Sequence, residues 1–271
     1  MAEGDNLARI ATVLGEVLVG RHVVAVGGRH GGPLGRVVGS AVVSVEARGK
    51  HLLIGFADGV TLHTHLGLHG SWHRYRPGER WRRAPSRAAV VIEAQGSGGG
   101  AVCVCFDPAR VELLETRALA LHPALARLGP DASAADFDPT AALARLRAPE
   151  RAAMALGDAL LDQSALAGVG NVYRSEVCFI ERVDPLQPVG EIEDEALHRL
   201  LDRSTQLLRA NLAGGPRRTT PPQVAGNLYV HGRTGRPCRR CGSGIVSGVS
   251  PGGRRAYWCP RCQGAEAASL G

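Results

Sequence analysis

The chain has 271 residues and a formal net charge of +7, and 44% of its residues are hydrophobic. This length exceeds what one small core needs, so we expect two domains and a small appendage. No apolar run reaches the roughly 18 residues of a membrane span, and the start, Met-Ala-Glu-Gly-Asp, lacks the pattern of a secretory signal. We therefore expect a cytoplasmic protein with an anionic partner such as nucleic acid, and neither a membrane protein nor a secreted one.

The N-terminal part of the chain predicts one helix followed by strands. Apolar residues recur with helical spacing from Asp5 to about Val19. Short runs rich in Val, Leu and Ile follow and predict strands, and Ala57-Asp-Gly59 predicts a hairpin turn between two of them. The predicted strands cover residues 37–38, 41–45, 51–56, 60–65, 89–92 and 101–106.

The middle of the chain, from Asp131 to about Leu212, predicts helices. Helical periodicity runs through 143–146, 154–161, 172–179 and 193–212. A basic, Gly- and Pro-containing segment, 213–222, predicts a flexible linker. The change from strands to helices, and then to a linker and the end of the chain, predicts an α+β protein with three domains. These domains cover residues 1–130, 131–222 and 223–271.

The seven cysteines fall into two groups. Cys103, Cys105 and Cys178 lie in apolar runs and are interpreted as buried small hydrophobic residues. The other four form two C-x-x-C pairs separated by seventeen residues, a spacing typical of a structural zinc site. A pair of disulfides is the alternative, but it fits an intracellular chain poorly. The predicted zinc ligands are Cys238, Cys241, Cys259 and Cys262, with strand, turn and strand between the pairs.

Lys50 is the only lysine of the chain, against 31 arginines. Arg stays protonated at any usable pH, whereas Lys can lose a proton and attack a carbonyl carbon. A surface cation is the ordinary alternative. The rarity of lysine here makes Lys50 a candidate for amine chemistry.

Two further features could carry chemistry. Gly168-Val-Gly-Asn171 precedes a predicted helix, where backbone N–H groups can approach a phosphate and Asn171 can add a donor. An ordinary Gly-rich turn capped by Asn is the alternative. At the start of the chain, Glu3 could move protons beside a terminal amine, or it could belong to a disordered acidic terminus.

Taken in order, these motifs resemble the formamidopyrimidine-DNA glycosylase and endonuclease VIII family, and its actinobacterial endonuclease VIII-like branch most closely. The resemblance covers roughly residues 2 to 265. It rests on the terminal Glu3-Gly-Asp, Arg48-Gly-Lys50, His65-Leu-Gly-Leu68-His-Gly-Ser-Trp72, Asp107-Pro-Ala-Arg110, Leu160-Leu-Asp-Gln with Gly-Val-Gly-Asn171, and the four-cysteine segment with Arg254.

The resemblance implies a fold and a reaction. An N-terminal β-sandwich flanked by helices is joined to a helix–two-turn–helix domain and a C-terminal four-cysteine zinc finger with one structural Zn²⁺. A damaged base is flipped out of double-stranded DNA and excised, and the strand is then nicked through a Schiff base. The implied protein is a monomer that works on DNA in the bacterial cytoplasm, at the nucleoid. Base flipping is physically required, because the target atoms are unreachable inside a base stack.

The resemblance also implies roles for individual residues. The α-amine of Ala2 is the nucleophile once Met1 is removed, and Glu3 handles protons at the sugar. Lys50 is the catalytic lysine of a hairpin. The remaining implied residues contact DNA: Leu68 and His69 at the gap in the base stack, Arg110 near it, and Asn171 and Arg254, the latter with Arg255 as a neighbouring alternative, on phosphates.

Two departures from the family pattern affect the predicted activity. Ala2 stands where the family usually has a proline, and its primary amine predicts strand nicking that is weaker than base excision. Asp107-Pro-Ala-Arg110-Val lacks one arginine and a Phe of purine-specific relatives, which favours oxidised pyrimidines or other modified bases. Lys50 could instead supply the Schiff-base amine.

The sequence therefore predicts a DNA glycosylase of base-excision repair. The alternative from another class is a protein that binds lesions or abasic sites with little or no catalysis. Glu3 argues against the binding protein, because a mere binder has little use for a carboxylate there. A generic zinc-ribbon protein would leave Glu3, Lys50 and Asn171 unexplained.

Overall fold

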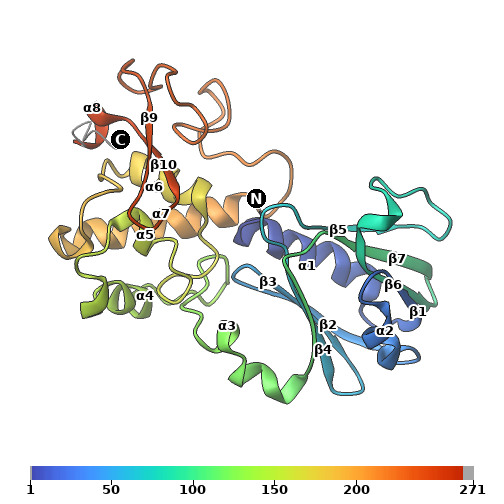
Figure 1. Cartoon of the computed structure of the whole chain (residues 1–271). Helices are drawn as coiled ribbons and strands as arrows, with labels where there is room; N and C mark the ends of the chain where they lie inside the picture. The colour runs from blue at the N-terminus through green and yellow to red at the C-terminus, as the bar shows by residue number, and fades with distance from the viewer. Residues whose placement is uncertain (1, 265–271) are drawn as a thin grey trace. The chain divides into compact units, whose positions relative to one another are not determined.

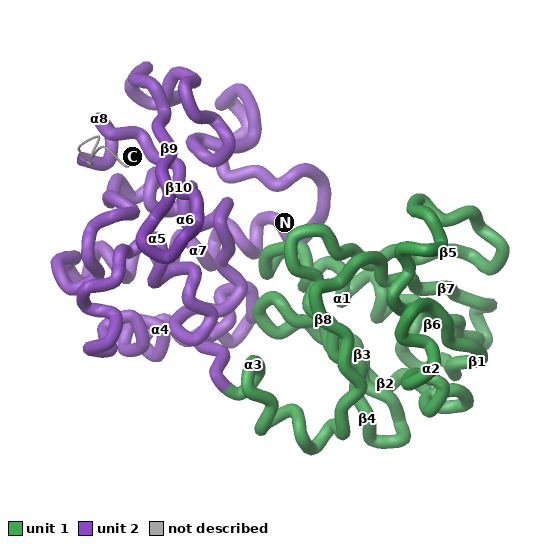
Figure 2. The backbone as a smooth tube through the Cα atoms, in the orientation of Figure 1, with its two compact units in different colours: residues 1–126 green, residues 127–271 purple. Residues whose placement is uncertain are grey.

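The fold is taken from a computed structural model that describes residues 2–264. The described residues form two compact units, one within 1–126 and one within 127–271 (Figure 2). Each unit has its own hydrophobic core. The three-domain division predicted from the sequence, with boundaries after residues 130 and 222, stays a prediction. Within residues 2–264, the helices are all too short or too polar to cross a bilayer.

The first unit begins with the helix α1, Gly4–Leu18, as its periodicity predicted. The buried side chains of α1 include Leu7, Leu14 and Leu18, which recur at helical spacing and form one apolar face. The helix ends before Gly20, whose φ of 78° suits glycine and lets the chain turn into the first strand. This face packs against the β2 strand and touches β3 and β5.

Two antiparallel four-stranded sheets follow α1 (Figure 1). The strand order is β1-β6-β7-β5 in the first sheet and β2-β3-β4-β8 in the second. Their bounds are β1 His22–Gly27, β2 Val42–Arg48, β3 His51–Phe56, β4 Val60–His65, β5 Ser71–Tyr75, β6 Ala88–Gly96, β7 Gly99–Phe106 and β8 Arg110–Glu115. Short helical turns lie between them: α2 Gly31–Leu34, η1 Gly35–Val37, η2 Pro85–Arg87, η3 Thr116–Leu121 and α3 Pro123–Ala126.

The two sheets share one core and so form the predicted β-sandwich. Ile54 and Leu62 of the second sheet and Val90 and Cys103 of the first belong to the same buried cluster. Side chains alternate between the faces of a strand, so the neighbours of Ile54 and Leu62 point away from this core. The second face of the β2-β3-β4-β8 sheet is therefore free to carry polar side chains.

The predicted strand at 37–38 is wrong. Val37 ends a 3₁₀ turn, in which the amide of Val38 donates to the carbonyl of Gly35 at 3.2 Å. Val37 is buried and Val38 is exposed, so the pair of valines reflects the burial of one side chain in a turn rather than a strand. Three strands, β1, β5 and β8, were not predicted: β5 and β8 include charged residues, and a short apolar run such as that of β1 fits a buried strand or a helix segment equally.

The second unit is mainly helical (Figure 1). Its helices are α4 Pro139–Leu146, η4 Pro149–Arg151, α5 Leu156–Ala159, α6 Asn171–Ile180, η5 Val189–Glu191 and α7 Asp194–Ala210. α4 and α6 pack against α7, whose buried leucines recur at helical spacing. The four helical runs predicted from the sequence coincide with α4, α5, α6 and α7.

The C-terminal part of this unit contains the hairpin β9 Val246–Val249 and β10 Arg255–Trp258, and the short helix α8 Pro260–Gln263. This matches the predicted strand, turn and strand. The segment 213–222 has no helix or strand, but Thr219 and Thr220 at its end are buried. Its end is therefore packed rather than free, in contrast to the flexible linker predicted.

Candidate functional site

The start of α1 holds Ala2 and Glu3 in fixed positions. Ala2 is partly buried against the sandwich core, and Glu3 is fully buried. The Glu3 carbonyl accepts hydrogen bonds from the amides of Asn6 at 3.0 Å and Leu7 at 3.1 Å, so this residue caps the helix. Met1 lies outside the described residues. A carboxylate thus sits directly beside the predicted nucleophile, on a rigid element.

Lys50 lies in the two-residue turn that joins β2 to β3. Arg48 and His51 close the hairpin, and Gly49 takes the first central position with a φ of 57°, as a II′-type turn requires. Burial of the His65 ring, on the adjacent strand, lowers the pKa of His65, and the positive charge of Lys50 lowers it further. The hairpin therefore presents the only lysine amine next to a neutral imidazole.

Leu68 is an apolar side chain held out on a tight loop. The loop joins β4 to β5, and the Leu68 side chain is 55% exposed. A Cβ on Gly70 would lie 2.3 Å from the carbonyl oxygen of Leu66, so the loop closes only with glycine there. His69 is exposed beside Leu68, and its carbonyl accepts a hydrogen bond from Arg83 at 3.1 Å. Such an exposed apolar residue on a braced loop suits insertion between bases.

Asp107 and Arg110 lie where β7 turns into β8. Asp107 has a φ of 45°, and a hydrogen bond from Arg87, at 2.8 Å, lowers the pKa of its carboxyl group. Arg110 opens β8 with a side chain 55% exposed and an ion pair to Glu112 at 3.3 Å. The guanidinium of Arg110 is therefore accessible to an outside ligand.

In the second unit, Asn171 is the first residue of α6 and follows the Gly168–Gly170 turn. Its Oδ1 is buried and has no hydrogen-bond partner among the described residues. The side-chain amide of Gln163, for which the sequence indicated no role, holds this turn. Its Nε2 donates to the carbonyls of Leu161 and Val169, and its Oε1 accepts from the amide of Gly168, at 2.9, 3.0 and 3.1 Å.

The tip of the β9–β10 hairpin carries Arg254, whose side chain is exposed. Its backbone is anchored, because Arg174 of α6 is fully buried and donates to the Arg254 carbonyl at 3.0 Å. Arg174 also pairs with Asp158 at 3.1 Å, and Asp158 accepts from Ser250 and the amide of Gly252 in the same turn. The hairpin tip is therefore tied to the helix that begins with Asn171.

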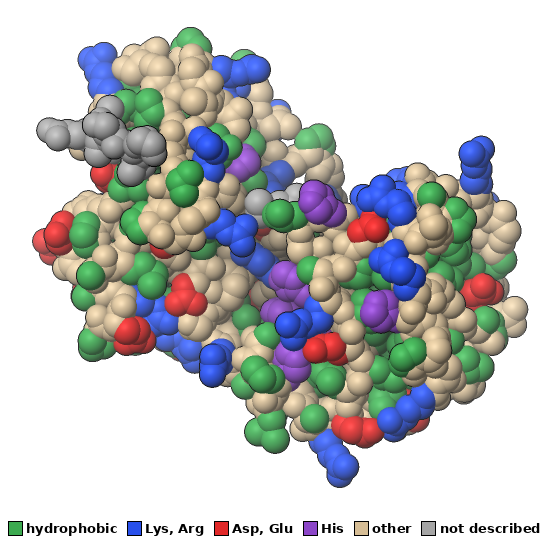
Figure 3. Space-filling model, viewed as in Figure 1, with side chains coloured by type: hydrophobic (Ala, Val, Ile, Leu, Met, Phe, Trp, Pro, Cys, Tyr) green, Lys and Arg blue, Asp and Glu red, His purple; other side chains and the backbone are tan. Residues whose placement is uncertain are grey.

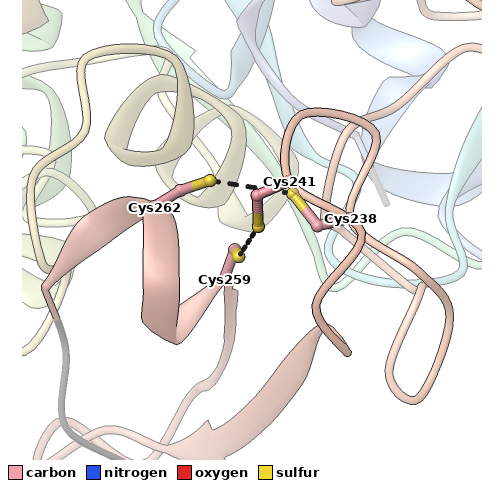
Figure 4. A group of neighbouring side chains, drawn as sticks. All are labelled: Cys238, Cys241, Cys259 and Cys262. Carbon is pink, nitrogen blue, oxygen red and sulfur yellow. Dashed lines mark hydrogen bonds between the residues drawn. The ribbon is translucent and has the colours of Figure 1, made fainter.

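The four predicted zinc ligands converge, as Figure 4 shows. The Sγ atoms of Cys238 and Cys262 are 3.8 Å apart, and those of Cys241 and Cys259 are 3.5 Å apart. Sulfurs around a tetrahedral zinc with bonds of about 2.3 Å lie roughly 3.8 Å from one another. The seven cysteines form no disulfides in the structure, and these separations are far longer than the ~2.05 Å of an S–S bond. The four cysteines can hold a metal ion.

The predicted site residues are divided between the two units. The first unit holds Ala2 and Glu3 just before α1, Lys50 in the β2–β3 turn, Leu68 and His69 on the β4–β5 loop, and Arg110 at the start of β8. The second unit holds Asn171, Arg254 and the four cysteines. Gln163 could have been suspected from its place in the Leu160-Leu-Asp-Gln motif, but its partners are backbone atoms that no sequence pattern identifies.

Comparisons with known proteins give the class. Residues 1–111 match the formamidopyrimidine-DNA glycosylase N-terminal domain, and residues 128–221 match the formamidopyrimidine-DNA glycosylase H2TH domain. A probable endonuclease 8 2 of Streptomyces coelicolor is 40% identical over 98% of this chain and 95% of its own length. A DNA-(apurinic or apyrimidinic site) lyase Nei2 of Mycolicibacterium smegmatis is 37% identical over 98% of this chain and 100% of its own.

The fold agrees with these matches. A crystal structure of Lactococcus lactis formamidopyrimidine-DNA glycosylase, non-covalently bound to DNA with an abasic site, superposes with a TM-score of 0.81 at 22% identity. It covers 97% of this chain and 99% of that one. The chain belongs to the formamidopyrimidine-DNA glycosylase and endonuclease VIII family, the DNA glycosylases of base-excision repair. The resemblance read from the sequence is confirmed.

Proposed function

We propose that this enzyme excises damaged bases, oxidised pyrimidines in particular, from double-stranded DNA and nicks the resulting abasic site weakly. The start of α1 carries the proposal. Glu3 is a fully buried carboxylate that directly follows the residue whose amine becomes terminal when Met1 is removed. A carboxyl group held at this position is placed for general acid–base chemistry at the sugar.

In the proposed reaction, the amine of Ala2 attacks C1′ of the flipped nucleotide. A C1′–N bond forms, and the glycosidic bond breaks as the base leaves with the electron pair and takes up a proton. Glu3 gives and receives protons at the sugar while the ring opens to a Schiff base. Elimination of the 3′ phosphate and then of the 5′ phosphate nicks the strand, and water releases the enzyme.

The other site residues are proposed to hold the DNA. Lys50 contacts the lesion site and its phosphate, and Asn171 and Arg254 bind phosphates that flank the flipped nucleotide. Leu68, with His69 beside it, fills the vacated stack, and Arg110 faces the gap. Filling the gap offsets part of an unstacking cost of a few kcal/mol. Accessible, braced positions of Leu68 and Arg254 support this assignment.

The Ala2 amine sets the balance between the two activities. A primary amine can form a Schiff base, but it lacks the secondary amine of proline, which forms an iminium readily. The relative from Mycolicibacterium smegmatis is named as an abasic-site lyase, which supports some lyase activity in this chain too. We infer base excision that is faster than strand nicking.

We infer that one Zn²⁺ is the metal of the four-cysteine cluster and that it is structural. Four thiolates fill a tetrahedral site, so no position remains for a catalytic water. The ion would hold the hairpin that carries Arg254. We further infer that the enzyme acts as a monomer in the bacterial cytoplasm, associated with the nucleoid through DNA.

Single-turnover assays on duplexes that contain an oxidised pyrimidine test the proposal. Base release and strand nicking are measured separately, and borohydride trapping on abasic-site DNA reports the Schiff base. Glu3→Gln should lower base release on the order of a hundredfold or more, whereas Glu16→Gln, an exposed position on the same helix, should leave it unchanged. Ala2→Pro should raise nicking and trapping.

Three results would change the assignment. Tight binding of lesion duplexes without release of any base would support the lesion-binding alternative. Trapping by the unaltered enzyme that equals trapping by Ala2→Pro would contradict the weakened lyase. Loss of trapping in Lys50→Ala, with trapping retained in Ala2→Gly, would move the Schiff base to Lys50.

A further inference from the structure

We propose that His63, Glu112 and His122 of the first unit form a second metal site, for a divalent first-row transition ion such as Zn²⁺. One nitrogen of each histidine and one carboxylate oxygen lie within 4.8 Å of one another. The site is separate from the four-cysteine cluster, which lies in the second unit. Figure 3 shows histidine side chains gathered over β3 and β4 beside basic and acidic side chains.

The sheet register brings two of the three residues together. His63 of β4 lies directly opposite Glu112 of β8. Their neighbours Leu62 and Leu113 are opposite each other too and pack in the sandwich core. Because side chains alternate, His63 and Glu112 point to the other face of the sheet. His122, directly after η3, adds the third group from above this face.

The distances suit a shared ion. His63 Nδ1 is 2.8 Å and His122 Nε2 is 3.2 Å from the same oxygen of Glu112, Oε2. Two histidines and one carboxylate are a ligand set that zinc uses in proteins, with a fourth position open to water. The second oxygen of Glu112, Oε1, is 3.3 Å from Arg110, so both oxygens of the carboxylate have a cation or donor nearby.

The surroundings of the three ligands are also those of a metal site. His63 Nε2, the nitrogen not aimed at Glu112, is 2.8 Å from His51 Nδ1. Metal-bound histidines commonly have such a hydrogen bond on the second nitrogen, which fixes ring and tautomer. The side chain of His63 is fully buried, that of His122 is 9% exposed and that of Glu112 is 29% exposed, so a bound ion would be held from the interior side and reached by water past Glu112.

Hydrogen bonds among the described residues leave one ring nitrogen of the buried His122 without a partner. Its Nδ1 is buried without a hydrogen-bond partner, and Glu112 is the one group that its ring contacts by a hydrogen bond. A buried imidazole held by one hydrogen bond leaves a polar atom unpaired, which is unfavourable. Coordination by Nε2 would give the ring a much stronger attachment and so offset that cost.

An ion at this site would join three parts of the first unit. It would link β4 and β8 to the segment after η3, on the face that also carries His51 and His65. His51 closes the hairpin of Lys50, and His65 lies directly opposite His51 on β4. The expected role is therefore a clamp that stiffens the sheet under the catalytic hairpin.

Metal content of the full-length protein tests this proposal. After saturation with Zn²⁺ and dialysis, mass spectrometry of the metal should find two ions per chain for the unaltered protein. His122→Ala and Glu112→Gln should hold one, and the matched control His198→Ala, an exposed histidine of α7, should hold two. Glu112→Gln keeps the side-chain volume and covers the case in which His122→Ala does not fold.

Cobalt absorption separates the two sites. The first equivalent of Co²⁺ should give the intense absorption of cobalt thiolate, and a second equivalent should add only the weak bands of nitrogen and oxygen ligands. That second step should disappear in Glu112→Gln. One ion per chain in the unaltered protein, or two in both variants, would overturn the proposal and leave a hydrogen-bonded histidine cluster.

Discussion

Single buried polar residues connect distant parts of the second unit, and Glu176 shows this best. This fully buried residue of α6 accepts backbone N–H bonds from Tyr229 at 2.7 Å and from Val230 and His231 at 2.8 Å. It also accepts a hydrogen bond from the hydroxyl of Thr219. One carboxylate thus fixes the packed end of the segment after α7 and the start of the four-cysteine region.

Glu176→Gln should therefore loosen residues 229–231 locally. The variant loses the charge and half of the acceptor capacity, and bonds to a charged group contribute about 1.5–3 kcal/mol each. Amide hydrogen exchange of these residues should speed up roughly 10- to 100-fold, measured by mass spectrometry of peptides. Glu195→Gln, an exposed position on α7, is the control. Unchanged exchange at 229–231 would refute this view of Glu176.

The sequence predicted the burial of residues that depend only on their own apolar segment. It did not predict the roles of residues whose partners are distant in the chain. Cys103, Cys105 and Cys178 were expected to be buried, and all three are fully buried. Burial raises the pKa of the Cys103 thiol to about 12, which fits an inert core residue. The roles of Glu176 and Gln163 were not predicted, because most of their partners are backbone groups that only the fold brings near.

At the scale of elements, periodicity predicted helices better than strands. The four predicted helical runs coincide with α4, α5, α6 and α7, and the pattern is clearest in α7, whose 17 residues repeat the apolar face several times. The strand β8 was missed because its sequence, Arg-Val-Glu-Leu-Leu-Glu, has three apolar residues and breaks strict alternation at Leu113-Leu114. The cluster of His63, Glu112 and His122 was missed as a consequence, because His63 and Glu112 meet only when β4 and β8 pair in register.

The β2–β3 hairpin gives a prediction at this scale, because its turn sets the position of Lys50. Gly49→Ala would place a Cβ at a φ of 57°, which costs about 1–2 kcal/mol and favours a shifted turn. A misplacement near 1 Å can cost about a hundredfold in rate. We expect single-turnover base excision to fall about 10- to 100-fold in Gly49→Ala, and less in Gly49→Asn, since Asn tolerates this conformation better.

A matched control lies at the other end of the same sheet. Gly59→Ala in the β3–β4 turn, with a φ of 80° and open space around a Cβ, should cost similar stability without moving Lys50. Thermal unfolding of both variants checks that the strain is comparable. Equal loss of excision in Gly49→Ala and Gly59→Ala would show that stability, rather than the position of Lys50, sets the rate.

At the scale of the whole molecule, the net charge of +7 was a weak indicator by itself and gained meaning from the motifs. Many arginine-rich proteins bind no nucleic acid, so charge alone left the partner open. The ordered motifs predicted the family over nearly the whole chain, and the comparisons confirm it. The fold was predictable to the same degree, since the motifs occupy both units.

The last prediction concerns how this charge contributes to DNA binding, and it rests on the proposed function. Each phosphate that an arginine neutralises releases counterions, so affinity falls steeply with salt. Affinity for a duplex with an abasic-site analogue, measured by fluorescence anisotropy from about 50 to 200 mM salt, should fall by orders of magnitude.

Arg254→Ala should weaken binding and reduce the slope of the plot of log affinity against log salt concentration by about one. Arg255→Ala should leave it unchanged, and the opposite result would assign the phosphate contact to Arg255. Asn171→Ala should weaken binding with little change of slope, because its amide is neutral. A flat salt response of the unaltered protein would contradict DNA as the partner.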